Sequence, residues 1–316
     1  MKALVFGLGA LGTVFAVSLK SAGHQVYAFV KENHLPLLKG KTLKMTGLFG
    51  NKKTEIDGYF TKPEELKSVD LDLIILTVKA FDTEKAISQI KEFIQTKTFL
   101  LIAQNGYGNY EKATQVLPKN QIILSRVIFG ARLLEPGLTE VTVFGDDVVI
   151  GQPENAISKK TLENIAEIFN QAGIPTKVSD EVYTILWEKI IYNSALNPLG
   201  ALLERTYGEL AENYETKFLM DKIIDEIFET LKVYEIKLRW ETSEAYKIHF
   251  YQTLIPPTAG HYPSMYYDLK NGKPTEIDAL NGAIVNLAEQ KGLKAPINKF
   301  ITFMIKQMEK VFSTAN

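Results

Sequence analysis

KALVFGLGALGTVFAVSLKSAGHQVYAFV, residues 2–30, is the stretch that decides the fold, because strand, turn, helix and strand follow one another within it. Residues 2–6 form a short apolar run typical of a buried β-strand. A glycine-rich turn comes next, and then a helical pattern that stops at Gly23, a residue suited to the position just past a helix. A second apolar run, HQVYAFV, begins at His24. This order predicts a βαβ unit.

Two more apolar runs indicate that the unit belongs to a larger sheet. LDLIILTV at residues 71–78 and FLLIAQ at residues 99–104 are separated by a helical pattern at residues 83–94. Continuous apolar runs of this length are typical of parallel strands covered on both faces. Residues 42–60 look like a small hairpin insertion, and residues 132–151 look like antiparallel strands that turn at a Glu-Pro-Gly sequence. We expect an open parallel sheet that these strands extend.

The pattern changes after about Gly173, because nearly all of the remaining chain has helical period with short breaks at Asn-Pro, Pro-Pro and Asn-Gly pairs. We therefore predict an α/β protein with two domains. Residues 1–175 form a Rossmann dinucleotide-binding domain, and residues 176–316 form an all-helical domain for substrate and catalysis. No low-complexity linker separates them, so we expect a tight connection.

Composition restricts the function classes that remain open. The 316 residues include 46% hydrophobic and 23% charged residues, and the formal net charge is -1, which gives no reason to expect nucleic acid or a membrane as a partner. The absence of cysteine excludes disulfides and thiolate chemistry, and the four histidines show no metal-binding spacing, so we expect no metal site. No apolar run has the length of a signal sequence or a membrane span, so we expect a cytoplasmic protein.

The glycine turn has the G-x-G-x-x-G spacing of a dinucleotide-binding motif, placed between a strand and a helix as that motif requires. Gly7 permits the tight turn, Gly9 lets the backbone approach a pyrophosphate, and Gly12 allows the helix to pack closely on the strand. The N–H groups at the start of the helix would face the phosphates. The predicted cofactor-binding turn comprises Gly7, Leu8, Gly9, Ala10, Leu11 and Gly12.

The end of the second strand bears on which dinucleotide is bound. An acidic residue there holds the ribose 2′-hydroxyl of NAD, whereas a cation favours the 2′-phosphate of NADP. Here Lys31 comes first and Glu32 second. We expect NADP(H) with Lys31 at the phosphate, while a solvated lysine and use of NADH stay open.

Two polar clusters follow predicted strands at the sheet edge where α/β proteins bind ligands. Lys79 directly follows one strand, and Gln104, Asn105 and Gly106 follow the next. Either cluster alone could be an ordinary turn. Their joint position beside the glycine turn favours contacts of Lys79 and Asn105 with cofactor or substrate.

The apolar segment WEKIIYNSALNPLGALL carries Lys189, Asn193 and Asn197 at steps of four, so that they share one helix face. A lysine that is partly buried has a lowered pKa and is a candidate general acid. Pro198 removes the backbone donor to the Ser194 carbonyl, which should bend or end the helix. The alternative is a solvated stripe with a routine helix end.

The segment PSMYYDLKNGKPTEIDALNG, residues 263–282, holds a third polar group. Its Asn-Gly pair ends one helix, and Thr275 can cap the next, which would place Glu276 in the first turn. Favourable placement against the helix dipole would be reason enough for such a glutamate. Ser264 and Asp268, four residues apart, would share one face of the preceding helix.

These features together resemble the ketopantoate reductases, also called 2-dehydropantoate 2-reductases, within the 6-phosphogluconate-dehydrogenase-like superfamily. The resemblance covers essentially the whole chain and rests on five motifs in order. They are GLGALG at 7–12, TVKAFDT at 77–83, AQNGYGN at 103–109, WEKIIYNSALNPL at 187–199 and SMYYDLKNGKPTEIDALNG at 264–282.

The resemblance implies reduction of 2-dehydropantoate to (R)-pantoate with NADPH, on the route to pantothenate and coenzyme A. It implies that Lys189 is the catalytic proton donor to the ketone oxygen, assisted by Glu276. Asp268 is interpreted as structural or orienting. The implied substrate-binding residues are Asn105, Asn193, Asn197 and Ser264.

The resemblance also implies cofactor contacts from Lys79, Asn105 and Glu276, besides the glycine turn. Lys31 stands where the family usually has a basic residue for the 2′-phosphate. Lysine cannot form the bidentate contact of arginine, so use of NADH stays open.

Two alternatives remain at this stage. A relative could reduce another small 2-oxo acid or an imine, because the lysine does not define the shape of the substrate. A non-catalytic NADP(H)-binding sensor would need only the glycine turn. The chain is expected to be a monomer or a homodimer.

Overall fold

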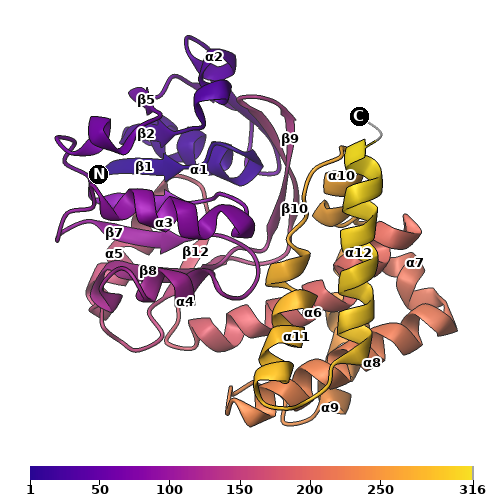
Figure 1. Ribbon diagram of the computed structural model, residues 1–316. Helices are drawn as coiled ribbons and strands as arrows, with labels where there is room; N and C mark the ends of the chain where they lie inside the picture. Colours follow the sequence, from indigo (N-terminus) through magenta and orange to yellow (C-terminus); the bar gives the residue numbers. More distant parts are fainter. Residues whose placement is uncertain (315–316) are drawn as a thin grey trace. The chain divides into compact units, whose positions relative to one another are not determined.

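The computed structural model describes residues 1–314, which divide into two compact units. The first unit comprises residues 1–105 and 109–183, and the second comprises the described residues 106–108 and 184–314. The units thus divide eight residues later than the boundary that we expected, and a three-residue piece of the first half belongs to the second unit. Figure 1 shows the sheets in the first half of the chain and helices throughout the second.

The main sheet of the first unit has eight strands. Its six neighbouring strands from β5 to β8 run parallel, β11 is antiparallel to β8, and β12 is parallel to β11. The predicted βαβ unit and open parallel sheet are confirmed. In sheet order the strands are β5 (Gly58–Phe60), β2 (Gln25–Phe29), β1 (Lys2–Phe6), β6 (Leu73–Leu76), β7 (Phe99–Ile102), β8 (Ile122–Arg126), β11 (Val148–Gly151) and β12 (Thr176–Val178).

A second, four-stranded sheet corrects the expectation that both insertions extend the main sheet. Four of their strands pair with one another, and only β5 and β11 join the main sheet. The reason lies in α1 (Ala10–Ser21), which packs against both sheets (Figure 1). Because residues 12–19 of α1 are all buried, its outer face needs a second apolar layer. The strands are β4 (Lys52–Thr54), β3 (Leu43–Gly47), β10 (Leu138–Phe144) and β9 (Phe129–Glu135).

Strand β12 lies in the region that we expected to be entirely helical. The side chain of Asn170 brackets Thr176, accepting its N–H at 2.8 Å and donating to its carbonyl at 2.8 Å. This clamp turns the chain back onto the sheet directly after a helix. The helices of this unit are α1, α2 (Leu35–Leu38), α3 (Thr83–Lys91), α4 (Asn109–Thr114) and α5 (Lys159–Gln171), with short 3-10 turns at η1 (Glu32–His34), η2 (Pro63–Leu66), η3 (Ala80–Asp82) and η4 (Lys119–Gln121).

The second unit contains helices and no strand among its described residues, and its first element is the long helix α6 (Val182–Leu203), whose first two residues belong to the first unit. Its core includes Trp187 and Phe250, which are fully buried. The other elements are α7 (Tyr207–Glu212), α8 (Tyr214–Val233), α9 (Ser243–His249), η5 (Phe250–Leu254), η6 (Pro256–Thr258), α10 (Ser264–Lys270), η7 (Ile277–Ala279), α11 (Asn281–Gln290) and α12 (Pro296–Thr314).

Candidate active site

The glycine turn lies at the carboxyl end of β1, and each of its glycines has a different surrounding. Gly7 has φ +105°, in the region that favours glycine. A Cβ on Gly12 would come within 2.0 Å of the Gly7 carbonyl oxygen, so only glycine lets α1 start this close to the strand. A Cβ on Gly9 would meet no atom within 4 Å. The turn is therefore tight on one side and open on the other.

The N-terminus of α1 follows this open side. It has no side-chain cap hydrogen bond and no acidic residue in its first turn. Its first backbone N–H groups therefore need a partner from outside the helix, and the positive end of the helix dipole favours an anion there. Residues 8–11 are at least partly exposed. These features fit the pyrophosphate of a dinucleotide.

Lys31 follows β2 at the same edge of the sheet, and its surroundings differ from the expectation. Its Nζ lies 2.9 Å from Oδ2 of Asp82. The neighbouring Glu32 pairs with another lysine, because its Oε1 lies 3.8 Å from Nζ of Lys62. The carboxylate that competes for Lys31 is therefore that of Asp82, fifty-one residues away in the chain. Sequence reasoning missed Asp82, because it looks like an ordinary residue at a helix start.

The loops after β6 and β7 carry Lys79 and Asn105 and are joined by a buried network. Gln104 donates to the Val78 carbonyl at 2.8 Å and to the Thr83 hydroxyl at 2.7 Å. Thr83 in turn donates to the side-chain oxygen of Asn109 at 2.7 Å, whose amide donates to the Asn105 carbonyl at 2.9 Å. Gln104 is thus a structural residue that fixes both loops. Thr83 and Asn109 gave no functional signal in the sequence.

Lys189, Asn193 and Asn197 lie one turn apart on α6. Lys189 is partly buried, whereas the asparagines are only 9% and 6% exposed, so these two positions are not a solvated stripe. The side chain of Asn193 has no hydrogen-bond partner among residues 1–314. Buried amides normally have partners inside the protein, so an unpaired one is a candidate for ligand binding.

Helix α6 continues through Pro198 to Leu203, so of the bend or end that we expected there, the end is wrong. Pro198 cannot donate to the Ser194 carbonyl, but the side chain of Asn281 donates to that oxygen at 3.0 Å. The same Asn281 amide also donates to Oδ1 of Asn298 at 3.0 Å. A side chain from α11 therefore replaces the missing helical hydrogen bond and joins α6 to the segment that follows Glu276.

Glu276 lies before the 3-10 turn η7 and not in the first turn of an α-helix, which begins only at Asn281. The hydroxyl of Thr275 accepts the Ile277 N–H at 3.2 Å. Thr275 therefore caps this short 3-10 turn and not the α-helix that we expected. The backbone N–H of Thr275 donates to Glu309 of α12 at 2.6 Å. Glu276 is partly buried, on a loop that α12 holds in place.

Ser264 is exposed at the start of α10, with Asp268 one turn further along the helix. The residue before it, Pro263, packs on α6, because a Cβ on Gly200 would come within 2.9 Å of the proline ring. Ser264 is therefore brought to the same end of α6 as Asn197. The helical unit thus carries the predicted residues Lys189, Asn193, Asn197, Ser264 and Glu276, and the sheet unit carries the glycine turn, Lys31, Lys79 and Asn105 at the carboxyl ends of its parallel strands.

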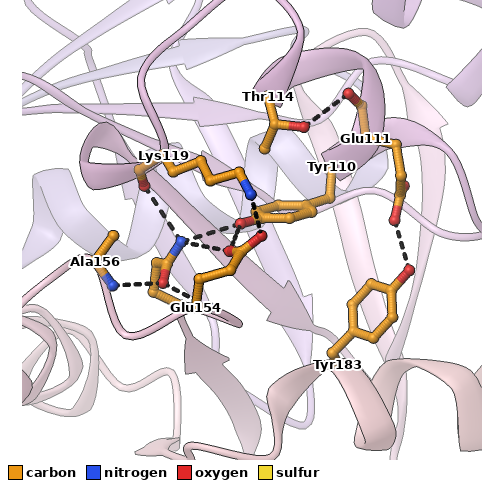
Figure 2. Close-up of polar contacts among 8 residues, drawn as sticks. Tyr110, Glu111, Thr114, Lys119, Glu154, Ala156 and Tyr183 are labelled. Atoms are coloured by element: carbon orange, nitrogen blue, oxygen red, sulfur yellow. Dashed lines mark hydrogen bonds and ion pairs between the residues drawn. The ribbon is translucent and has the colours of Figure 1, made fainter. Parts of the chain in front are cut away.

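A further polar cluster, drawn in Figure 2, surrounds Tyr110 and Glu154. Glu154 accepts hydrogen bonds from Tyr110, from Lys119 at 2.8 Å and from Gln152 at 2.8 Å. Burial would raise the pKa of Glu154, but these donors outweigh it and hold the pKa below its ordinary value. Because its members satisfy one another, the cluster is structural. Nearby, Tyr183 donates to Glu111 at 2.8 Å.

Among residues 1–314 no group of three or more His, Asp or Glu side chains is arranged to hold a metal ion. No helix in this part of the chain is long and apolar enough to span a membrane.

Known proteins match this chain over nearly its full length. The model of ketopantoate reductase PanE/ApbA matches residues 3–155, and its C-terminal counterpart matches residues 181–309. The 2-dehydropantoate 2-reductase of Aquifex aeolicus is 47% identical over 98% of this chain and 97% of its own length. That of Pyrococcus abyssi is 31% identical over 98% of both chains.

Solved structures agree with these matches. A ternary structure of D-mandelate dehydrogenase with NADH and anilino(oxo)acetate has a TM-score of 0.88 at 26% identity, over 99% of both chains. The PanE/ApbA family ketopantoate reductase of Ralstonia eutropha has a TM-score of 0.85 at 25% identity, also over 99% of both chains.

Proposed function

Because this chain belongs to the ketopantoate reductase family, we propose that it reduces 2-dehydropantoate to (R)-pantoate with NADPH as the hydride donor. The observation that carries the proposal is the 47% identity with the Aquifex aeolicus 2-dehydropantoate 2-reductase over nearly the full length of both chains. The reaction places the enzyme in pantothenate and coenzyme A biosynthesis. A cytoplasmic location and a monomeric or homodimeric state stay predictions.

The sheet unit holds the cofactor in this proposal. The open side of Gly9 and the uncapped N-terminus of α1 support pyrophosphate binding, because a backbone without side chains can approach the phosphates closely. Lys79 and Asn105 contact the nicotinamide end. When bound, the dinucleotide supplies the hydride. The network of Gln104 and Thr83 keeps the two loops in place before the cofactor arrives.

The helical unit supplies the groups that act on the ketone. Lys189 donates a hydrogen bond to the ketone oxygen and gives up its proton as the carbonyl carbon is reduced. Its positive charge stabilises the alkoxide character that develops only in the transition state, so its contribution belongs to turnover. Glu276 assists at the lysine and at the substrate hydroxyl, and it reaches the cofactor. Asn193, Asn197 and Ser264 hold the carboxylate and hydroxyl ends.

Lys31 and Asp82 together bear on the choice between NADPH and NADH. Lys31 offers one positive charge to a 2′-phosphate, but Asp82 already occupies it at 2.9 Å. A phosphate beside this pair has to approach a carboxylate as well as an ammonium, which weakens the preference for NADPH. We therefore place NADPH first and expect measurable activity with NADH.

A second candidate function is reduction of another small 2-oxo acid. It is favoured by the likeness to D-mandelate dehydrogenase, whose structure contains NADH and anilino(oxo)acetate. A non-catalytic cofactor sensor is less well supported, because such a protein has no use for the unpaired amide of Asn193 beside a lysine.

The test is a steady-state comparison of ketopantoate with pyruvate and benzoylformate, each with NADPH and with NADH. We expect the highest kcat/KM with ketopantoate and NADPH. Equal or faster reduction of another 2-oxo acid contradicts the substrate assignment, and a preference for NADH contradicts the role of Lys31. Cofactor binding without turnover of any acid would favour the sensor.

A further inference from the structure

The amide of Asn197 is bonded on one side only. Its Oδ1 accepts a hydrogen bond from the hydroxyl of Tyr207 at 2.7 Å, and both residues are buried, with exposures of 6% and 5%. Its Nδ2 has no acceptor among residues 1–314. The donor side of the amide is therefore left for a ligand, whereas the acceptor side is used within the protein.

Tyr207 is itself held in place from several directions. Its ring packs edge-on against Tyr192, with centroids 5.7 Å apart, and against His261 at 5.2 Å. Its backbone N–H donates to the His261 carbonyl at 3.1 Å. Burial raises the pKa of Tyr207 well above 10, so the hydroxyl keeps its proton at all working pH values. The hydroxyl is thus a fixed and permanent donor.

The orientation of the amide decides what Asn197 can bind. With Oδ1 facing Tyr207, the Nδ2 donor faces away and suits a carboxylate or hydroxyl oxygen. A flipped amide would present Oδ1 to the same ligand and repel a carboxylate, and it would place Nδ2 against a hydroxyl whose proton needs another acceptor.

We propose that Tyr207 is a positioning residue, whose hydroxyl fixes the Asn197 amide so that Nδ2 donates to an oxygen of the 2-oxo acid. This inference rests on the proposed function for the identity of the substrate. Tyr207 itself touches no substrate. Its effect is on substrate binding, because the Asn197 contact is made in the ground state as well as in the transition state.

Tyr192 offers a matched control within the same aromatic cluster. Its hydroxyl lies 2.6 Å from the hydroxyl of Thr258 and has no role toward Asn197. Tyr192→Phe and Tyr207→Phe each remove one partly or fully buried hydroxyl from neighbouring rings. A merely structural effect of the lost hydroxyl should therefore appear in both variants.

The experiment measures kcat and KM for ketopantoate, the Kd for NADPH and the Tm in four variants: Tyr207→Phe, Tyr192→Phe, Asn197→Ala and the double variant Tyr207→Phe/Asn197→Ala. We expect Tyr207→Phe to raise KM about tenfold with kcat and NADPH affinity little changed, because the amide then loses the hydrogen bond that keeps Nδ2 toward the substrate, and one hydrogen bond is worth about one decade in affinity. Tyr192→Phe should leave KM unchanged. In the Asn197→Ala background the Tyr207 substitution should have no further effect on KM.

Equal KM values for Tyr207→Phe and wild type overturn the inference, as does the same rise in KM whether or not Asn197 is present. If Tyr207→Phe does not fold, Asn197→Asp decides, because it keeps an acceptor for Tyr207 and replaces the Nδ2 donor by a carboxylate oxygen. We expect it to raise KM more than Asn197→Ala does, and normal substrate binding by this variant overturns the inference. If wild type prefers another 2-oxo acid, the substrate assignment fails, and the same comparison is made with that acid.

Discussion

The glycine turn after β1 and the polar face of α6 are both sites on helices, but they are built in opposite ways. In the turn, the absence of side chains makes the site: Gly9 leaves space for a ligand beside the backbone, and Gly12 lets the start of α1 lie against the backbone of Gly7. On α6, side chains form the proposed site, and their orientation depends on residues that are distant in the chain. Asn281 satisfies the Ser194 carbonyl from 87 positions away. A backbone site can thus be specified locally, whereas a side-chain site needs the tertiary structure.

The largest effect should come from removing chemistry on α6 while leaving the turn intact. Lys189→Ala should lower kcat at least about 100-fold, because proton donation and charge stabilisation at the ketone oxygen are lost together. NADPH affinity, measured by fluorescence titration, should stay within about twofold, since binding at the turn does not involve this residue. Lys177→Ala, a lysine of β12 paired with Asp146, is the control and should keep full activity. Near-normal turnover of Lys189→Ala would remove it from the mechanism.

Two alanine substitutions in the turn separate its packing from its binding. Gly12→Ala places a Cβ 2.0 Å from a carbonyl oxygen and should lower the free energy of unfolding by about 1–3 kcal/mol. Gly9→Ala meets no atom within 4 Å and should leave the Tm nearly unchanged while weakening NADPH binding. Thermal unfolding with and without NADPH measures both effects. Equal loss of stability in the two variants would show that the turn does not divide these roles.

A double-mutant cycle tests whether Asn281 replaces the hydrogen bond that Pro198 cannot make. Asn281→Ala leaves the buried Ser194 carbonyl without a donor and should cost about 1–3 kcal/mol of stability. In a Pro198→Ala background, residue 198 regains its N–H and can donate to that carbonyl. Asn281→Ala should then cost less, with a coupling energy of about 1 kcal/mol in urea unfolding. Additive effects would mean that the two residues act independently.

The smallest expected effect concerns the pair at the end of β2. Asp82→Asn removes the carboxylate beside Lys31 and should raise the ratio of kcat/KM for NADPH over NADH by about 1.5-fold to fivefold, as for one exposed charge interaction. Glu32→Gln is the matched control, because Glu32 pairs with Lys62 and should change the ratio less. The difference should shrink in high salt. An unchanged ratio for Asp82→Asn would show that Lys31 does not face the 2′-phosphate.

Much of the fold could be predicted because its signals are local. The apolar runs, the G-x-G-x-x-G spacing and the positive φ of Gly23 concern residues that are neighbours in the chain. The separate four-stranded sheet could not be predicted, because the pairing of β3 with β10 joins segments almost a hundred residues apart. The clamp by Asn170 that creates β12 has no distinctive pattern in the sequence.

For the candidate site, the sequence by itself determined which residue types are present and on which elements they lie. The steps of four in Lys189, Asn193 and Asn197 place them on one helix face by geometry alone. Only the tertiary structure decided that Asn193 and Asn197 are buried, that α6 continues past Pro198, and that Asp82 pairs with Lys31. The physical reason is that hydrogen bonds and ion pairs between side chains depend on distances in the folded protein. The spacing of residues along the chain does not specify these distances.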